Sequence, residues 1–166
     1  MKSRLKFKMR TKVKKIFAGD FYTTRDREEI ISTLLGSCVA TCLIDNVNSV
    51  YGMNHFMLPM ELKRKDKDKL GKYGLDAMEI LISAMLKQGA NLKYLEAKLF
   101  GGGRVVKSSY SNVAKANVDF AKMYLEQQQI PIIAQDVGGT YGRQIYFYPK
   151  EGIYSRKIKS THQELA

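Results

Sequence analysis

Two cysteines in the apolar segment "TLLGSCVATCLID", Cys38 and Cys42, are the side chains of this sequence best suited to nucleophilic chemistry. A cysteine nucleophile needs a base or an ion-pair partner, because a thiol pKa of about 8.5 leaves little thiolate at neutral pH. Histidine supplies that function most readily, and the chain has only His55 and His162. Since His162 lies near the C-terminus in a polar segment, where we expect fraying, His55 is the more credible partner.

The two cysteines stand in different local contexts. Cys38 directly follows Gly36 and Ser37, and backbone N–H groups at such a corner can face a developing negative charge, so both residues are oxyanion-binding candidates. A buried cysteine without chemistry is the competing interpretation of an isolated Gly-Ser-Cys sequence. If residues 38–44 form one strand, the two cysteine Cα atoms lie about 13 Å apart, beyond the ~7 Å that a disulfide tolerates. We therefore expect Cys42 to be a core residue.

Neither a metal nor a cofactor is indicated by the sequence. The chain lacks the H-E-x-x-H motif and a second cysteine pair at zinc-ligand spacing. The glycine-rich segments "FGGGRVVKSS" and "GGTYGR" match neither a P-loop nor a dinucleotide-binding fingerprint. Within the second segment, Arg143 could bind a carboxylate or face solvent.

A hairpin is the element that would bring the cysteine and the histidine together. Residues 30–46 and 49–59 are strand-like and meet at an Asp-Asn turn. Antiparallel pairing of these strands would carry His55 back toward Cys38.

Two hydroxyl side chains stand shortly before the corner. Ser32 or Thr33 could orient the imidazole of His55 as the third member of a catalytic triad, because that member fixes the tautomer and the angle of the base. Spacing alone does not choose between the two.

The remaining periodicity predicts an α+β fold with mixed or antiparallel sheets, arranged like a sandwich, and two main helices packed against them. We expect helices over residues 75–88 and 111–129, the first ended by Gly89. We expect a loop over the Lys/Asp-rich residues 61–72. Further strands are expected over residues 92–103, 130–139 and 143–158, the last as a hairpin around "KEG".

Basic residues are unevenly distributed along the chain, whose net charge is +12. Residues 1–15 hold eight Lys and Arg and no acid, and residues 61–72 hold six bases against three acids. The arm at 1–15 alternates apolar and basic residues with a period of two, which predicts an edge strand and not a membrane-binding amphipathic helix. These segments could attract nucleic acid, an anionic membrane surface or an acidic protein, or they could be solvated segments that only aid solubility. The motifs and interleaved aromatics of nucleic-acid binders are absent from the sequence.

Length and composition favour one domain over residues 1–166, with the basic arm at its start. No apolar run approaches the ~18 residues of a membrane span, and the first residues lack the apolar stretch of a secretory signal. Two cysteines without an export signal suit a reducing compartment. We expect a cytoplasmic protein without membrane insertion and without nucleic acid as a partner.

Six blocks between residues 19 and 158 read, in order, "TLLGSCVATCLID", "GMNHFMLP", "KYGLDAM", "LEAKLFGGG", "NVAKANVDFAKMYL" and "DVGGTYGRQIYFYPKEGIYSRKI". Together they resemble the chemoreceptor glutamine deamidase family CheD. The resemblance implies a Cys-His-Thr triad, with Cys38 as nucleophile and His55 as base. Thr33 matches the third member if the loop is one residue shorter here, and Ser32 is the fallback.

The resemblance also implies a reaction and partners. Family members hydrolyse glutamine side-chain amides on the cytoplasmic domain of bacterial chemoreceptors, the methyl-accepting chemotaxis proteins, to glutamate and ammonia; some are linked to methyl-ester hydrolysis. We expect a Cys38 thiolate, paired with protonated His55, to attack the amide and form a thioester. A CheC-type phosphatase is a partner in some species. The alternative is a non-catalytic adaptor that binds the chemoreceptor or CheC.

Overall fold

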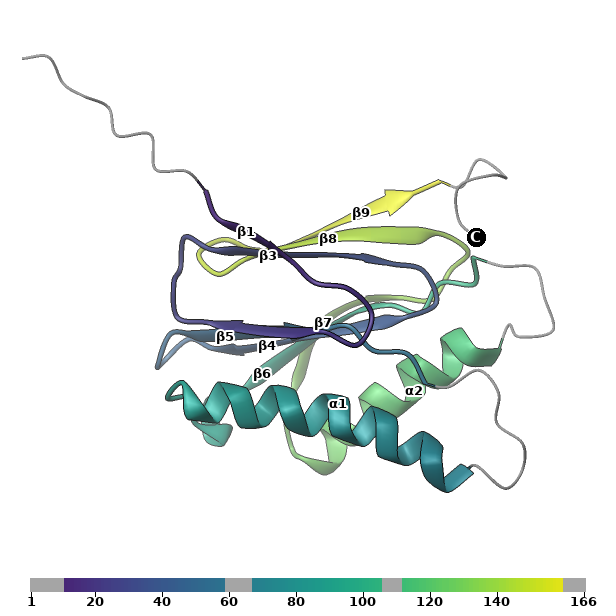
Figure 1. The fold of residues 1–166 in the computed structure, drawn as a ribbon, viewed down its shortest axis with the longest axis horizontal. Coiled ribbons are helices and arrows are strands. Elements are labelled where there is room, and N and C mark those ends of the chain that lie inside the picture. The colour runs from purple at the N-terminus through teal and green to yellow at the C-terminus, as the bar shows by residue number, and fades with distance from the viewer. Residues whose placement is uncertain (1–10, 59–66, 106–111, 160–166) are drawn as a thin grey trace, which may run out of the picture.

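Three layers make up the part of the chain that the computed structural model describes, residues 11–58, 67–105 and 112–159. Figure 1 shows a four-stranded sheet, a five-stranded sheet below it and two helices below that. The strand order of the first sheet is β1 (Val13–Lys15), β3 (Ile30–Leu35), β8 (Gly142–Tyr148) and β9 (Gly152–Ile158). The order of the second is β2 (Phe21–Thr24), β5 (Val50–Asn54), β4 (Val39–Asp45), β6 (Glu96–Gly101) and β7 (Ile132–Val137).

The helices complete the predicted architecture. They are α1 (Lys67–Lys87) and α2 (Asn112–Gln127), with a short 3-10 helix η2 (Leu92–Tyr94) before β6. The predicted α+β fold, with a sandwich of two sheets and two main helices packed against it, is confirmed. The predicted hairpins β4–β5 and β8–β9 are also present, since both pairs are antiparallel.

Strand β4 lies in the centre of the five-stranded sheet and is buried along its whole length. Its side chains alternate, so Val39 and Leu43 belong to the core under the helices, while Ala40 and Cys42 belong to the core between the sheets. A strand buried on both faces needs apolar residues at nearly every position, which explains its continuous apolar run. The buried, unbridged Cys42 is a core residue, as predicted.

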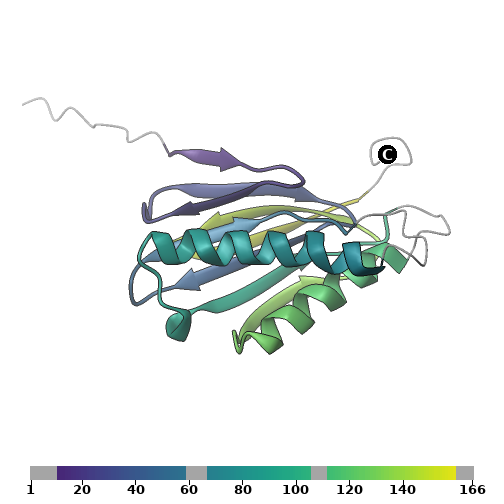
Figure 2. The same ribbon diagram turned by 60° about the horizontal axis from the view of Figure 1, so that its bottom comes forward.

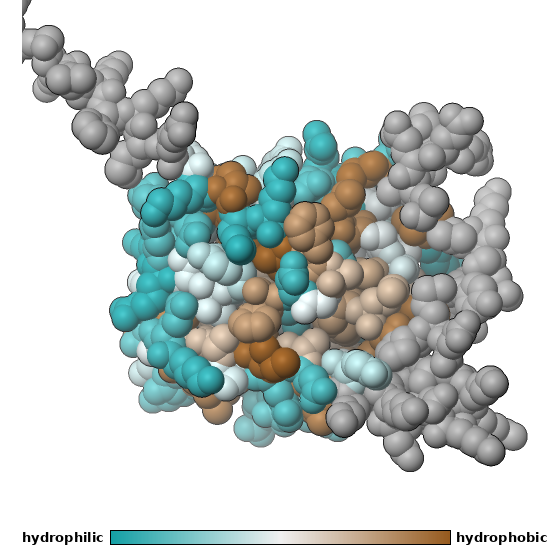
Figure 3. All heavy atoms as spheres, in the orientation of Figure 1, coloured by the Kyte–Doolittle hydropathy of each residue, from teal (hydrophilic) through white to brown (hydrophobic). Residues whose placement is uncertain are grey.

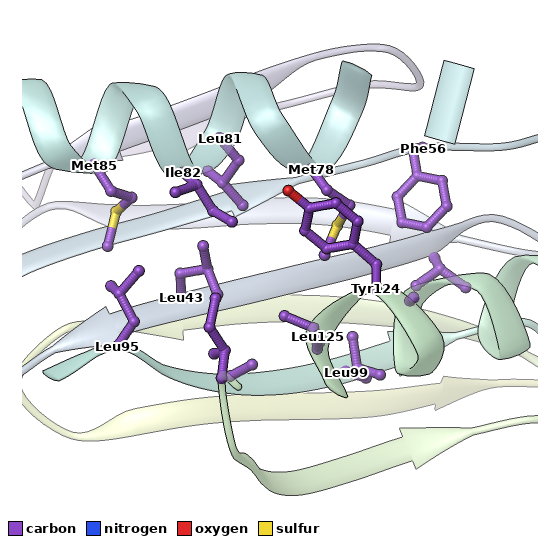
Figure 4. Close-up of a cluster of buried hydrophobic side chains, with 14 of the residues drawn as sticks. Leu43, Phe56, Met78, Leu81, Ile82, Met85, Leu95, Leu99, Tyr124 and Leu125 are labelled. Carbon is purple, nitrogen blue, oxygen red and sulfur yellow. The ribbon is translucent and has the colours of Figure 1, made fainter. Parts of the chain in front are cut away.

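Helix α1 covers the outer face of the five-stranded sheet. Figure 4 shows Met78, Leu81 and Met85 of α1 pointing toward Leu43 of β4, all within one buried cluster. The spacing of these residues places them on one stripe of the helix, which is the periodicity seen in the sequence. Gly89 follows the helix with a φ of +103°, a left-handed conformation that favours glycine, and so ends the helix as predicted.

Helix α2 packs beside α1 where a side chain would not fit. Figure 2 shows the two helices meeting on the same face of the sheet. A Cβ atom at Gly74 of α1 would lie 2.6 Å from the Cε1 atom of Phe120 of α2. A side chain at position 74 would therefore force the ring of Phe120 to move.

Two expectations about charged segments need comment. The loop predicted over residues 61–72 is wrong in its second half, because α1 begins at Lys67; its first half, 61–66, lies outside the described residues. Lysine and leucine are good helix formers, so a charged and solvated sequence suits the first turns of a helix as well as a loop. The predicted edge strand in the basic arm is confirmed at Val13–Lys15, which pairs only with β3, and residues 1–10 lie outside the described part.

Candidate active site

The chain changes sheets at Gly36, Ser37 and Cys38, between β3 of one sheet and β4 of the other. Cys38 is therefore the last residue before β4, and it is partly exposed, whereas Cys42 is buried. Figure 1 shows this connection at the same end of the sandwich as the connection between β1 and β2. A corner at the open end of a sandwich gives a thiol access to solvent while the strands on either side stay paired.

His55 directly follows β5, the strand that pairs with β4. The antiparallel register continues past β5 to a bridge between Val39 and Phe56, with N–H···O distances of 3.0 and 2.9 Å. In this register Ala40 stands opposite His55, and Cys38 is the diagonal neighbour of His55 on the same face of the sheet. The hairpin thus brings Cys38 and His55 together, although no hydrogen bond joins them in the part of the chain that is described.

Thr33 of β3 reaches His55 across the space between the sheets. Its Oγ1 atom lies 2.7 Å from Nδ1 of His55 and donates a hydrogen bond of 2.8 Å to the carbonyl of Ile16. Because a threonine hydroxyl has one proton, which goes to Ile16, Thr33 accepts from Nδ1–H of His55. The second ring nitrogen, Nε2, is then the unprotonated one. Ser32 points elsewhere and accepts from Nε2 of Gln144 at 2.9 Å.

Burial determines the charge state of both reactive groups. It lowers the pKa of His55 to about 4, with the carboxylate of Asp20 acting in the opposite direction. Burial also raises the pKa of Cys38, against the effect of its own backbone N–H. At neutral pH the pair is a thiol beside a neutral imidazole. The expected resting pair of thiolate and imidazolium does not agree with these directions, because desolvation disfavours the charged form of each group.

The backbone carbonyls of the corner are all engaged. The carbonyl of Gly36 accepts from the N–H of Gly103 at 2.9 Å, and that of Cys38 accepts from the N–H of Gly102 at 2.8 Å. The carbonyl of Ser37 accepts at 2.9 Å from a side-chain amide on α2. The corner is therefore held from the side of the glycine-rich segment and α2.

The N–H groups of the corner point the other way, because N–H and C=O are opposed in a trans peptide. Neither the N–H of Ser37 nor that of Cys38 has an acceptor elsewhere among the described residues. The N–H of Cys38 favours the thiolate form of its own side chain, against the effect of burial. Two free donors beside the nucleophile form a site that can bind an oxyanion.

Arg143 supports the same corner from β8. Its fully buried guanidinium donates to the carbonyl of Gly101 at 3.2 Å and to Oδ1 of Asp136 at 3.1 Å. Although burial alone would raise it, hydrogen bonds from Arg143 and Ser155 hold the pKa of Asp136 below its usual range. Arg143 thus binds a carboxylate of its own chain and does not face solvent. A Cβ at Gly101 would lie 2.2 Å from the carbonyl oxygen of Cys38, so only glycine allows this approach.

A cavity of about 340 Å³ opens beside the histidine. It is lined by Lys15, Ile16, Phe17, Ala18, Ser32, Thr33, Leu34, His55 and Gln144. Phe17 and Leu34 are 68% and 50% exposed. Figure 3 shows hydrophobic residues in the middle of the face turned to the viewer, among hydrophilic ones. The base therefore lies below a surface that offers apolar contacts to a partner.

Comparison with known proteins identifies the family. Residues 57–157 match the family model described as CheD chemotactic sensory transduction. The chain is 43% identical over 170 residues to the "Probable chemoreceptor glutamine deamidase CheD 2" of Shewanella oneidensis, covering 96% of this chain and 83% of the relative. The chain belongs to the CheD family. A CheD relative from Laribacter hongkongensis is 43% identical over 89% of this chain and 73% of its own, and one from Hydrogenovibrio crunogenus is 42% identical over 90% and 80%.

Solved structures resemble this chain less than its CheD-family relatives do. The Bacillus licheniformis protein YfiH covers 70% of this chain and 50% of its own at 15% identity, with a TM-score of 0.47. That level is too low to argue from. Within the ranges that the structure describes, no group of three or more His, Cys, Asp or Glu could hold a metal ion. No helix in those ranges is long and apolar enough to cross a membrane.

The site in this CheD-family chain contains residues that sequence patterns did not single out. Asn117, which holds the carbonyl of Ser37, is the clearest case. Gly102 and Gly103 hold the carbonyls of Cys38 and Gly36, and Arg143 holds the glycine segment; the sequence drew attention to these three residues but not to these roles. Asn117 had a detectable signal, because it falls at helical spacing between apolar positions of α2 and so lies on the buried face. His162 lies outside the described residues.

Proposed function

We propose that this CheD-family chain is a protein-glutamine deamidase, an amidohydrolase that converts glutamine side chains on chemoreceptors to glutamate and ammonia. Family membership and the names of the relatives support the reaction class. The observation that carries the proposal is the hydrogen bond that Thr33 accepts from Nδ1 of His55. It leaves Nε2 free to act as a base on the face of the sheet shared with Cys38.

The first half of the reaction is acylation of Cys38. Nε2 of His55 takes the thiol proton as Sγ attacks the amide carbon, so charge develops only during the reaction. The N–H groups of Ser37 and Cys38 bind the oxyanion of the tetrahedral intermediate. The imidazolium then gives its proton to the amide nitrogen, the C–N bond breaks, and ammonia leaves a thioester on Sγ.

The second half is hydrolysis of the thioester. Neutral His55 takes a proton from water, the resulting hydroxide adds to the thioester carbon, and the same N–H groups bind the second oxyanion. Collapse of this intermediate breaks the C–S bond, releases glutamate, and returns the proton from His55 to Sγ. Thr33 and the nearby negative charge of Asp20 favour the imidazolium that forms in each half.

The partners follow from the same proposal. The substrate is the cytoplasmic domain of a chemoreceptor, which places the reaction in the cytoplasm, and a CheC-type phosphatase is a second binding partner. The net charge of +12 would steer association with an acidic surface, so association should weaken as salt is added.

The test is ammonia release from a purified cytoplasmic fragment of a chemoreceptor, with mass spectrometry to locate glutamines converted to glutamate. Cys38→Ala and His55→Ala should abolish release, whereas Cys42→Ala, which removes the buried thiol, should retain it. Full activity of Cys38→Ala would refute the proposal.

A non-catalytic adaptor is the second candidate, favoured by the raised pKa of Cys38. An adaptor would bind the chemoreceptor fragment or CheC with equal affinity before and after Cys38 is alkylated, and would release no ammonia. The binding and release measurements together separate the two functions.

A further inference from the structure

We propose that Asn117 is a positioning residue that keeps the oxyanion-binding corner aligned with the strand that carries the base. The inference rests on the proposed deamidation and assigns a role to a residue of α2. Asn117 is fully buried, on the helix face turned toward the sheet. Its side chain contacts both of the chain segments that must be aligned for the reaction.

Both ends of the Asn117 amide are used. Its Nδ2 donates to the carbonyl of Ser37 at 2.9 Å, and its Oδ1 accepts from the N–H of Leu58 at 2.9 Å. Ser37 stands immediately before the nucleophile, and Leu58 follows His55 by three residues. One buried side chain therefore connects the two halves of the site, from outside the sheets that carry them.

The contact with Ser37 determines where the N–H of Cys38 points. The carbonyl of Ser37 and the N–H of Cys38 belong to the same rigid peptide plane, with opposite directions. While Nδ2 holds the carbonyl toward α2, the N–H is held on the opposite side of the same peptide plane, beside the nucleophile. Without Nδ2, the carbonyl would lose its donor and would be free to turn, and the N–H would turn with it.

Many buried asparagines serve stability alone, and Asn54 is an example. Its amide accepts from the N–H of Thr41 at 2.8 Å and donates to the carbonyl of Ala77 at 3.3 Å, joining β5 to β4 and α1 without touching the corner. Asn117 differs because its donor ends on the peptide that precedes Cys38. The two roles make different predictions for reactions that do and do not form an oxyanion.

The experiment compares two reactions of the same thiol. Alkylation of Cys38 by iodoacetamide displaces iodide at a CH2 carbon and forms no oxyanion, whereas deamidation of a chemoreceptor fragment does. Asn117→Ala should lower kcat for deamidation about 10- to 100-fold, with KM little changed. The loss is smaller than the roughly 100- to 1000-fold for removal of an oxyanion donor, because here the donor is displaced and not removed. The alkylation rate should fall much less, because alkylation loses only the effect of the Cys38 N–H on the thiol pKa.

Asn117→Asp gives a second measurement if the alanine variant does not fold. Burial raises the pKa of the introduced carboxyl, and its protonated form can donate to Ser37 and accept from Leu58 as the amide does. Its ionised form cannot donate. The ratio of its kcat to that of the unaltered protein should therefore fall as pH rises through that pKa.

Asp45→Asn is the matched control, because Asp45 is equally buried and hydrogen-bonded but lies at the other end of β4, against Asn48 and Asn91. It should leave both rates unchanged. Three results would overturn the positioning role while deamidation by the unaltered protein stands. The first is an equal loss of alkylation and deamidation in Asn117→Ala, and the second is no loss of deamidation in that variant. The third is a kcat ratio for Asn117→Asp that does not change with pH. No ammonia release by the unaltered protein would overturn the deamidase and this inference together.

Discussion

Thr33 and His55 belong to different sheets, yet Oγ1 of one lies 2.7 Å from Nδ1 of the other. The hydroxyl proton is already committed to the carbonyl of Ile16, so the hydrogen bond from the imidazole has one direction. This contact across the sandwich selects the tautomer in which Nε2 is the base. Testable consequences follow for the hydroxyl, for the buried imidazole and for the buried ion pair behind the corner.

Replacing Thr33 should damage catalysis more than stability. Thr33→Val keeps the shape but removes the acceptor for Nδ1–H of His55, so we expect kcat/KM for deamidation to fall about 10- to 100-fold. Thr33→Ser should recover most of the loss. The control is Ser32→Ala, because Ser32 contacts Gln144 and not the histidine. A larger loss in Ser32→Ala than in Thr33→Val would assign the triad position to Ser32.

The pH dependence of the reaction should reflect a neutral pair. Since burial lowers the pKa of His55 to about 4, the base is unprotonated above that pH, and kcat/KM should decline only as pH falls toward 4. The raised pKa of Cys38 predicts that iodoacetamide alkylation keeps accelerating above neutral pH. An alkylation rate that is already constant between pH 5 and pH 8 would instead indicate a resting ion pair.

The same histidine should make stability depend on pH. Its pKa is about 4 in the folded protein against an ordinary value of 6.5, so the unfolded chain binds more protons between these values. The free energy of unfolding should therefore decrease as pH falls from about 6.5 to 4. Urea unfolding of His55→Gln, which cannot be protonated in this range, should show a shallower decrease. Equal slopes for both proteins would contradict the buried, neutral imidazole.

Breaking the buried ion pair should destabilise the fold. Arg143→Met leaves Asp136 without its cation, and we expect the free energy of unfolding to fall by about 2–4 kcal/mol. The loss should be smaller than for a fully buried ion pair, because the Asp136 side chain is 35% exposed. Arg143→Lys should not restore stability, since a single ammonium cannot reach both Gly101 and Asp136 as the guanidinium does.

An exposed pair supplies the control for that measurement. Lys115 and Asp119 form an ion pair on α2 with side chains 76% and 56% exposed. Lys115→Ala should change the free energy of unfolding by less than about 1 kcal/mol. Similar losses from Lys115→Ala and Arg143→Met in urea unfolding would show that burial does not matter here.

Local sequence patterns were sufficient to predict the strands and the turn that carry the reactive side chains. The turn between β4 and β5 and the apolar alternation predicted a hairpin, and its register places His55 and Cys38 on one face. The rise of a strand and the Gly-Ser corner likewise distinguished Cys42, which is buried between the sheets, from Cys38 at the corner. These features depend on neighbours within about twenty residues, where turn type and side-chain period determine the geometry.

Only the tertiary structure decided which hydroxyl faces the histidine and what holds the corner. Thr33 and Ser32 point to opposite faces of β3, and which face lies inside the sandwich depends on packing against a sheet formed by other segments. Asn117 reaches Ser37 from eighty residues away in sequence, and Arg143 reaches Gly101 from forty-two. Burial also determined the charges of Cys38 and His55, because desolvation depends on all the atoms packed around a group and not on its neighbours in the chain.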